Sequence, residues 1–124
     1  MNVFWVALGG AVGSAGRYAI SLIPLKGGFP TLTLATNVLG ALLIGFIVGL
    51  ATDRESLTPN ATLFWKTGVC GGFTTFSTFS LEAVGLLENK SYLAAGLYMF
   101  LSVVLCLVGI LCGRKLALLS GRGF

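Results

Sequence analysis

The chain has 124 residues, of which 56% are hydrophobic and 10% are charged, with eight Lys and Arg against four Asp and Glu. Its mean hydropathy is +0.95. A soluble domain carries about 25% charged residues, so this chain has too few charges to cover a water-facing surface, and a soluble or disordered protein is excluded. The sequence contains no histidine. Because histidine is the usual general base and metal ligand, an enzyme is the least expected class.

The charged residues divide the chain into apolar segments, which predict an all-α membrane protein with one domain, residues 1–124. A helix needs about 20 mostly apolar residues to cross roughly 30 Å of hydrocarbon. Residues 27–52 form an uncharged run of 26 residues, and residues 91–113 form one of 23. We expect four transmembrane helices, at about residues 3–24, 31–51, 62–87 and 92–114.

Short polar connections join these segments, so sequential helices are expected to be antiparallel. Arg17 interrupts the N-terminal apolar run, and no basic stretch precedes it. We therefore expect this run to be the first membrane helix and not a cleavable signal. The side that holds both termini and the loop at residues 53–60 carries five Lys and Arg, against two or three on the other side. This difference favours cytoplasmic termini by a small margin.

Small residues form faces on three of the predicted helices. They are Gly9-x-x-x-Gly13, Ala41-x-x-x-Gly45-x-x-x-Gly49 and Gly109-x-x-x-Gly113. Such faces let helix backbones approach closely, and the sequence leaves open whether they pack within one chain or between two copies. The three cysteines, Cys70, Cys106 and Cys112, lie in apolar stretches without a C-x-x-C pair. We expect them to be packing residues and not a disulfide or metal site.

The third predicted helix has an unusual composition. Gly71 and Gly72 are adjacent, and residues 74–80 include five hydroxyl side chains. Glycine and hydroxyl residues weaken a helix interior, so a break near residues 71–77 is expected. Non-helical backbone at membrane depth persists only where it is buried in protein or lines a wet cavity, and its free carbonyls can bind ions.

Phe73, Phe76 and Phe79 alternate with these hydroxyls at a spacing of three. They could be lipid-facing or packing residues. Alternatively, they could contact an ion, because a phenyl ring has a positive edge and a negative face. Edges turned to a narrow path would favour a small anion, whereas faces would favour a cation.

Further polar residues are predicted at membrane depth: Arg17, Asn37 and Glu82. Ionisable groups inside a membrane are candidates for function, although Arg17 could snorkel, Glu82 could approach the interface and Asn37 could join two helices. The fourth helix carries polar side chains at i, i+4 and i+8, which share one face. They are Tyr98, Ser102 and Cys106.

Three motifs resemble the Fluc (CrcB) family of small fluoride channels. They are Gly-Gly-x-x-Gly-x-x-x-Arg-Tyr at 9–18, Thr-Asn-x-x-Gly at 36–40 and Gly-Gly-Phe-Thr-Thr-Phe-Ser-Thr-Phe-Ser-x-Glu at 71–82. The resemblance covers almost the whole chain. It implies a fluoride-selective channel in the cell inner membrane that exports fluoride passively. It further implies an antiparallel, dual-topology homodimer with two pores, and a central structural sodium ion bound by the backbone carbonyls of Gly71 and Thr74.

The resemblance also implies a set of residues along each fluoride path. The phenylalanine edges would face fluoride, Asn37 would donate to it, Arg17 would lie near the vestibule and Glu82 would lie at one end. Cys106 departs from the family pattern, in which Ser or Thr is usual, and a thiol is a weak donor. The implied set is Arg17, Asn37, Phe76, Ser77, Thr78, Phe79, Ser80, Glu82, Tyr98 and Ser102.

Two other membrane functions fit the composition less well. A small dual-topology, proton-coupled multidrug transporter would use a carboxylate in its first helix, and this chain has none there. A membrane subunit that only binds partners would not need Arg17, Asn37 and clustered hydroxyls at depth. Neutral donors suit a strongly hydrated anion, because they replace its water without trapping the ion.

Overall fold

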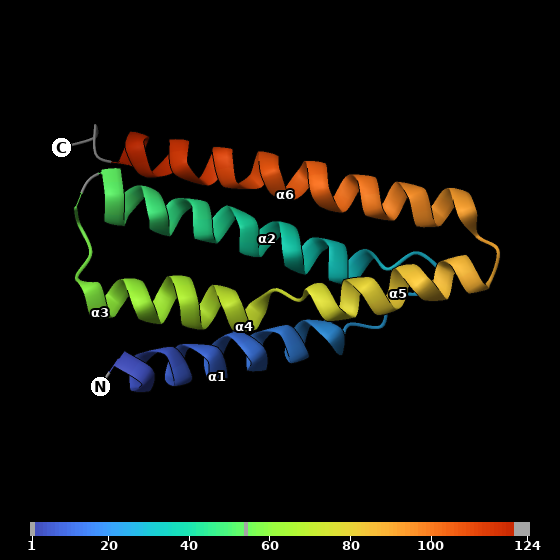
Figure 1. Ribbon diagram of the computed structural model, residues 1–124, viewed down its shortest axis with the longest axis horizontal. Helices are drawn as coiled ribbons and strands as arrows, with labels where there is room; N and C mark the ends of the chain where they lie inside the picture. Colours follow the sequence, from blue (N-terminus) through green and yellow to red (C-terminus); the bar gives the residue numbers. More distant parts are fainter. Residues whose placement is uncertain (1, 54, 121–124) are drawn as a thin grey trace.

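The computed structural model describes residues 2–53 and 55–120, which are helical apart from short connections and contain no strand. The helices run roughly along one direction, and the first described helix begins at the end of the bundle where the last described helix ends (Figure 1). In chain order, the elements are α1 (Asn2–Ser21), α2 (Thr31–Val48), the π-helix η1 (Gly49–Asp53), α3 (Pro59–Thr62), the π-helix η2 (Leu63–Cys70), α4 (Gly71–Phe73), α5 (Phe76–Glu88) and α6 (Tyr92–Ser120).

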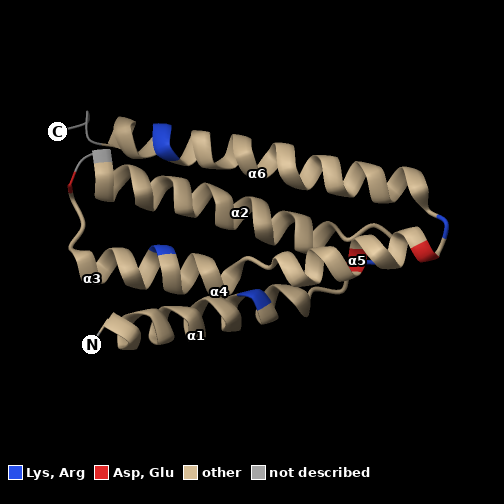
Figure 2. Ribbon diagram, in the orientation of Figure 1, with Lys and Arg blue, Asp and Glu red and all other residues tan. Residues whose placement is uncertain are grey.

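Three helices are long and apolar enough, by length and composition, to cross a membrane: Asn2–Ser21, Thr31–Thr52 and Tyr92–Ser120. Figure 2 shows how few charged residues the bundle carries, with none along α2 or along most of α6. The chain is therefore a multi-pass membrane protein. Arg54 and Arg122, which enter the expected charge asymmetry, lie outside the described residues.

The segment from Pro59 to Glu88 is not one continuous helix but four shorter ones. Thr58 caps its start, since the Thr58 hydroxyl accepts a hydrogen bond from the N–H of Ala61 at 3.1 Å. The segment then follows π-helical geometry as far as Cys70, with hydrogen bonds from residue i to residue i+5. It leaves helical geometry between α4 and α5, where Thr74 and Thr75 are extended.

The glycine faces pack within the chain. A Cβ added to Gly13 on α1 would collide with the carbonyl oxygen of Val69 and would lie 2.8 Å from the nitrogen of Phe73. On the other side of the bundle, a Cβ added to Gly113 on α6 would collide with the carbonyl oxygen of Leu42 on α2. Thus α1 packs closely on η2 and α4, and α2 packs closely on α6, because glycine leaves room for backbone against backbone.

Candidate functional site

The interruption between α4 and α5 consists of two extended residues. Thr74 has φ −82° and ψ 157°, and Thr75 has φ −149° and ψ 115°. The side chain of Asn37, from the middle of α2, supports this stretch with two hydrogen bonds. Its Oδ1 accepts from the N–H of Thr75 at 2.8 Å, and its Nδ2 donates to the carbonyl oxygen of Thr75 at 3.2 Å. Asn37 therefore pairs both backbone polar groups of Thr75.

Because the N–H of Thr75 bonds to Asn37, one carbonyl at the end of α4 loses its helical partner. In a continuous helix, the N–H of Thr75 would bond to the carbonyl of Gly71, but here it bonds to Asn37. The carbonyl of Cys70, one residue earlier, accepts from both the N–H and the hydroxyl of Thr74, at 3.0 and 2.8 Å. The helix thus ends with Cys70 satisfied and the Gly71 carbonyl outside the helical hydrogen-bond ladder.

The hydroxyl of Thr75 organises the start of α5. Its Oγ1 accepts from the N–H of Thr78 at 3.0 Å, as a helix-capping residue does. It also donates to the hydroxyl of Thr78 at 3.0 Å and lies 3.3 Å from that of Ser77. Ser80 instead turns back to its own helix, where its hydroxyl donates to the carbonyl of Phe76 at 2.9 Å.

Arg17 from α1 contacts the end of α4. Its Nε donates to the carbonyl oxygen of Gly72 at 3.1 Å, and the hydroxyl of Ser14 lies 3.5 Å from the same oxygen. A guanidinium at this position complements the negative end of a helix dipole. Arg17 therefore places a positive charge beside the end of α4, where its Nε is hydrogen-bonded to the Gly72 carbonyl.

Glu82 on α5 accepts two hydroxyl hydrogen bonds from two other helices. Thr33 on α2 donates to Oε1 at 2.7 Å, and Tyr98 on α6 donates to Oε2 at 2.9 Å. Tyr98 is fully buried, so this carboxylate joins α2, α5 and α6 at one place. Thr33 was not expected from the sequence, although its position four residues before Asn37 places it on the same face of α2.

The two phenylalanines of α5 differ in their surroundings. Their ring centroids lie 5.5 Å apart with planes inclined by 41°. Phe79 also packs against Tyr98, at 5.1 Å between centroids, beside the buried cluster of α5 and α6. Phe76, in contrast, is 80% exposed.

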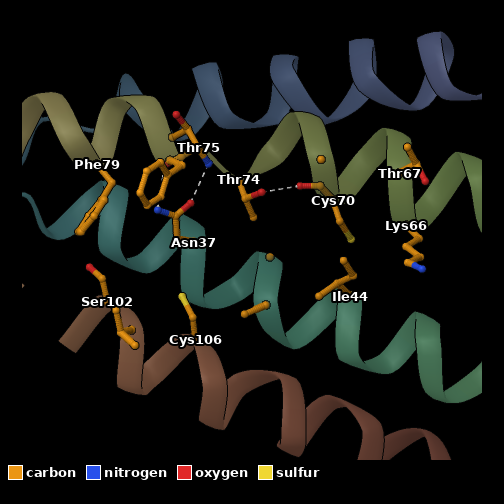
Figure 3. Close-up of a pocket in the computed structure, with 15 residues that line it drawn as sticks. Asn37, Ile44, Lys66, Thr67, Cys70, Thr74, Thr75, Phe79, Ser102 and Cys106 are labelled. Carbon is orange, nitrogen blue, oxygen red and sulfur yellow. Dashed lines mark hydrogen bonds between the residues drawn. The ribbon is translucent and has the colours of Figure 1, made fainter. Parts of the chain in front are cut away.

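An open groove of about 600 Å³ runs beside the interruption, between α2, α6 and the segment from η2 to α5 (Figure 3). Its lining includes many of the residues singled out from the sequence: Asn37, Gly71, Thr74, Phe76, Phe79, Ser102 and Cys106. Ser102 is buried, and its hydroxyl oxygen has no hydrogen-bond partner among the described residues. An unpartnered buried hydroxyl is unfavourable unless a ligand or water binds to it.

Two smaller cavities lie beyond the groove. One of about 130 Å³ is lined by Arg17, Thr78 and Glu82 and shares Thr75 with the groove. The next, of about 420 Å³, shares Thr33 and Glu82 with it. The remaining predicted residues, Ser77, Ser80 and Tyr98, do not line these three cavities.

Comparison with known proteins identifies the family of the chain. The family model described as "CrcB-like protein, Camphor Resistance (CrcB)" matches residues 4–114. The chain belongs to the CrcB family. It is 47% identical over 118 residues to the "Fluoride-specific ion channel FluC" of Elusimicrobium minutum, covering 92% of this chain and 91% of that protein.

Other CrcB relatives carry the same name. The protein of a Roseiflexus species is 42% identical over 120 residues, covering 94% of this chain and 97% of its own. The protein of Chlorobaculum tepidum is 46% identical over 122 residues, covering 97% of this chain and 90% of that protein. The CrcB family is therefore one of ion channels and not of enzymes.

Proposed function

We propose that this chain forms a fluoride-selective channel, with the groove beside Asn37 as part of its ion path. The observation that carries the proposal is the pairing of Asn37 with Thr75, which supports the extended residues of the third segment beside a groove whose lining includes neutral donors. The relatives named as fluoride-specific channels support the choice of ion.

The groove suits a small, strongly hydrated anion. Asn37 uses one amide hydrogen for Thr75 and has a second one, and the buried hydroxyl of Ser102 has no hydrogen-bond partner in the described part of the chain. The edges of Phe76 and Phe79 carry partial positive charge. Such neutral groups can replace water around fluoride without holding the ion too strongly.

The proposed transport is passive, so that fluoride leaves the cell down its gradient and its cytoplasmic concentration falls. A proton-coupled transporter needs a carboxylate on the substrate path. Among the described residues, no acidic one lines the 600 Å³ groove, and both oxygens of Glu82, which lines the two smaller cavities, accept hydrogen bonds from hydroxyls. This arrangement favours a channel over a proton-coupled multidrug transporter.

We also propose that two copies assemble in the inner membrane as an antiparallel, dual-topology homodimer with two pores. A channel needs a wall on every side, and the groove is open along one side, where Phe76 is 80% exposed. A second copy would close the groove and bury this ring. Two equivalent grooves would then give two pores.

A structural sodium ion at the dimer centre fits the end of α4. The carbonyls of Gly71 and Thr74 lie at the interruption, both residues line the open groove, and the Gly71 carbonyl is outside the helical ladder. Carbonyls at broken helix ends are typical sodium ligands in membranes. The ion would supply a positive charge that attracts anions and neutralises carbonyls facing each other.

The test is fluoride efflux from liposomes that contain the purified chain. Valinomycin would carry the compensating potassium, and a fluoride electrode would follow the efflux beside chloride-loaded vesicles. We expect fast loss of fluoride and negligible loss of chloride. Protein that is folded and inserted but releases no fluoride would refute the proposal and direct the next assay to drug export.

A further inference from the structure

Among the described residues that line the 600 Å³ groove, Lys66 is the one with a charged side chain. It belongs to η2, four residues before Cys70, and its side chain is exposed. Within the part of the chain that the structure describes, no acidic residue shares the groove lining with it. The positive charge of Lys66 is therefore not offset by a carboxylate within the groove.

The position of Lys66 is at one end of this groove. Figure 3 shows Lys66 and Thr67 at one end, Phe79 and Ser102 at the other, and Asn37 between them. The 420 Å³ cavity, which lies beyond the 130 Å³ one, is also lined by a lysine, Lys26, but Glu82 lines the same cavity. The two ends therefore differ: among the described lining residues, Lys26 has an acidic neighbour in Glu82, whereas Lys66 has none.

We propose that Lys66 attracts fluoride electrostatically to this end of the groove and raises its entry rate without coordinating it. This inference rests on the proposed channel function. An exposed ammonium stays hydrated, so it can increase the local concentration of an anion without binding it tightly. The neutral donors around Asn37 then replace the water of the ion farther along the groove.

The alternative is that Lys66 only reaches toward the membrane surface with its long side chain. The two roles differ in their dependence on salt. Electrostatic attraction between exposed charges weakens as the Debye length falls from roughly 30 Å at 0.01 M to 3 Å at 1 M ionic strength. A structural anchoring role would not follow this dependence.

The experiment measures initial fluoride efflux from liposomes for wild type, Lys66→Gln, Lys66→Arg and Lys66→Glu, at low and high concentrations of an impermeant salt. At low ionic strength we expect Lys66→Gln to lose about two- to threefold of the rate. Coulomb's law gives this factor for one unit charge about 8 Å away in water. Lys66→Glu should lose more, Lys66→Arg should keep the wild-type rate, and all four should converge at high ionic strength.

Lys115→Gln is the matched control, because Lys115 is also exposed and lies outside the groove lining. It should leave the rate unchanged at both ionic strengths. A wild-type rate for Lys66→Gln at low ionic strength would overturn the inference, as would a deficit that persists at high ionic strength. A wild-type chain that carries no fluoride would overturn the proposed function itself, which separates the two failures.

Discussion

The carboxamide of Asn37 takes the place of the helical hydrogen-bond partners of Thr75. It accepts from the Thr75 N–H at 2.8 Å and donates to the Thr75 carbonyl at 3.2 Å. The two residues are 38 positions apart. Each backbone group left unpaired at membrane depth would cost on the order of several kcal/mol, because no water is present there to form a hydrogen bond with it. One side chain on α2 therefore allows the third segment to stop being helical at Thr74 and Thr75.

This pairing predicts that Asn37→Asp and Asn37→Ala both impair the channel. Aspartate keeps the acceptor for the Thr75 N–H but loses the donor to its carbonyl, whereas alanine loses both. We expect fluoride efflux to fall at least about tenfold and stability to fall by about 1–3 kcal/mol per unsatisfied group. Efflux and thermal unfolding in detergent are the measurements.

Asn60→Ala is the control for this pair, since Asn60 is exposed on α3 and outside the groove lining. It should leave efflux unchanged. If Asn37→Ala transports fluoride at the wild-type rate, Asn37 serves only as a contact between helices and takes no part in the ion path.

Phe76 and Phe79 have different surroundings, so we expect their substitution to affect fluoride efflux alike but stability differently. Phe76→Ile should remove an aromatic edge from the groove and greatly reduce fluoride efflux without unfolding the chain, because Phe76 is 80% exposed within a single copy and contributes little to its packing. Phe79→Ile should reduce efflux as well, and should also lose about 1–2 kcal/mol of stability, because Phe79 packs on Tyr98.

Phe100→Ile is the matched control. Phe100 is 64% exposed on α6 and does not line the groove, so efflux should persist. Undiminished efflux in both Phe76→Ile and Phe79→Ile would remove the argument from phenyl edges.

The carboxylate of Glu82 accepts a hydrogen bond from Thr33 on one oxygen and from Tyr98 on the other. Tyr98→Phe and Thr33→Val should each lower the stability, by up to about 1–3 kcal/mol, because the partly buried Glu82 carboxylate loses a donor. Both should slow fluoride efflux, since Glu82 lines two of the three cavities. In a Glu82→Gln background, the two substitutions should cost less than in wild type, by a coupling of about 0.5–3 kcal/mol.

Tyr92→Phe supplies the control, because Tyr92 is 65% exposed at the start of α6. Removing its hydroxyl should change neither stability nor efflux. Strictly additive losses for Thr33, Tyr98 and Glu82 would show that the three residues do not act through one carboxylate.

Hydropathy and charge spacing predicted the all-helical membrane class, because both depend only on local composition. Glycine and hydroxyl content likewise pointed to weakness in the third segment, and the structure has extended residues at Thr74 and Thr75. The π-helical stretch Leu63–Cys70 was not expected. Hydropathy does not distinguish hydrogen bonds to residue i+4 from those to residue i+5.

Long-range partners could not be read from the sequence. Asn37 was a candidate because it is polar at depth, but its partner Thr75 depends on how α2 packs against the third segment. Thr33 was missed for the same reason, since only its bond to Glu82 distinguishes it from other threonines. Arg17 was expected near a vestibule, and the structure adds its hydrogen bond to the carbonyl of Gly72.

The proposed sodium site predicts that removal of sodium weakens the protein. Prolonged exchange into N-methylglucamine buffer should lower the thermal stability and slow fluoride efflux, because the carbonyls of Gly71 and Thr74 would lose their cation. Returning sodium, but not potassium, should restore both properties. Stability and efflux that are independent of sodium after full exchange would contradict the site.

The glycine face of α1 gives a prediction about folding alone. Gly13→Ala should be strongly destabilising, because its Cβ would collide with the carbonyl oxygen of Val69 and approach the nitrogen of Phe73 at 2.8 Å. Neither backbone atom can move without shifting η2 and α4, and overpacking of this kind costs about 1–3 kcal/mol or more. Gly10→Ala, on the same helix, meets no atom within 4 Å.

Gly10→Ala should therefore be neutral or slightly stabilising, since alanine favours a helix over glycine by about 1 kcal/mol. Thermal unfolding of the two variants in detergent compares them directly. Equal stability for Gly13→Ala and Gly10→Ala would mean that α1 does not pack backbone to backbone against η2. The close approach that lets Arg17 reach the Gly72 carbonyl would then lack its physical basis.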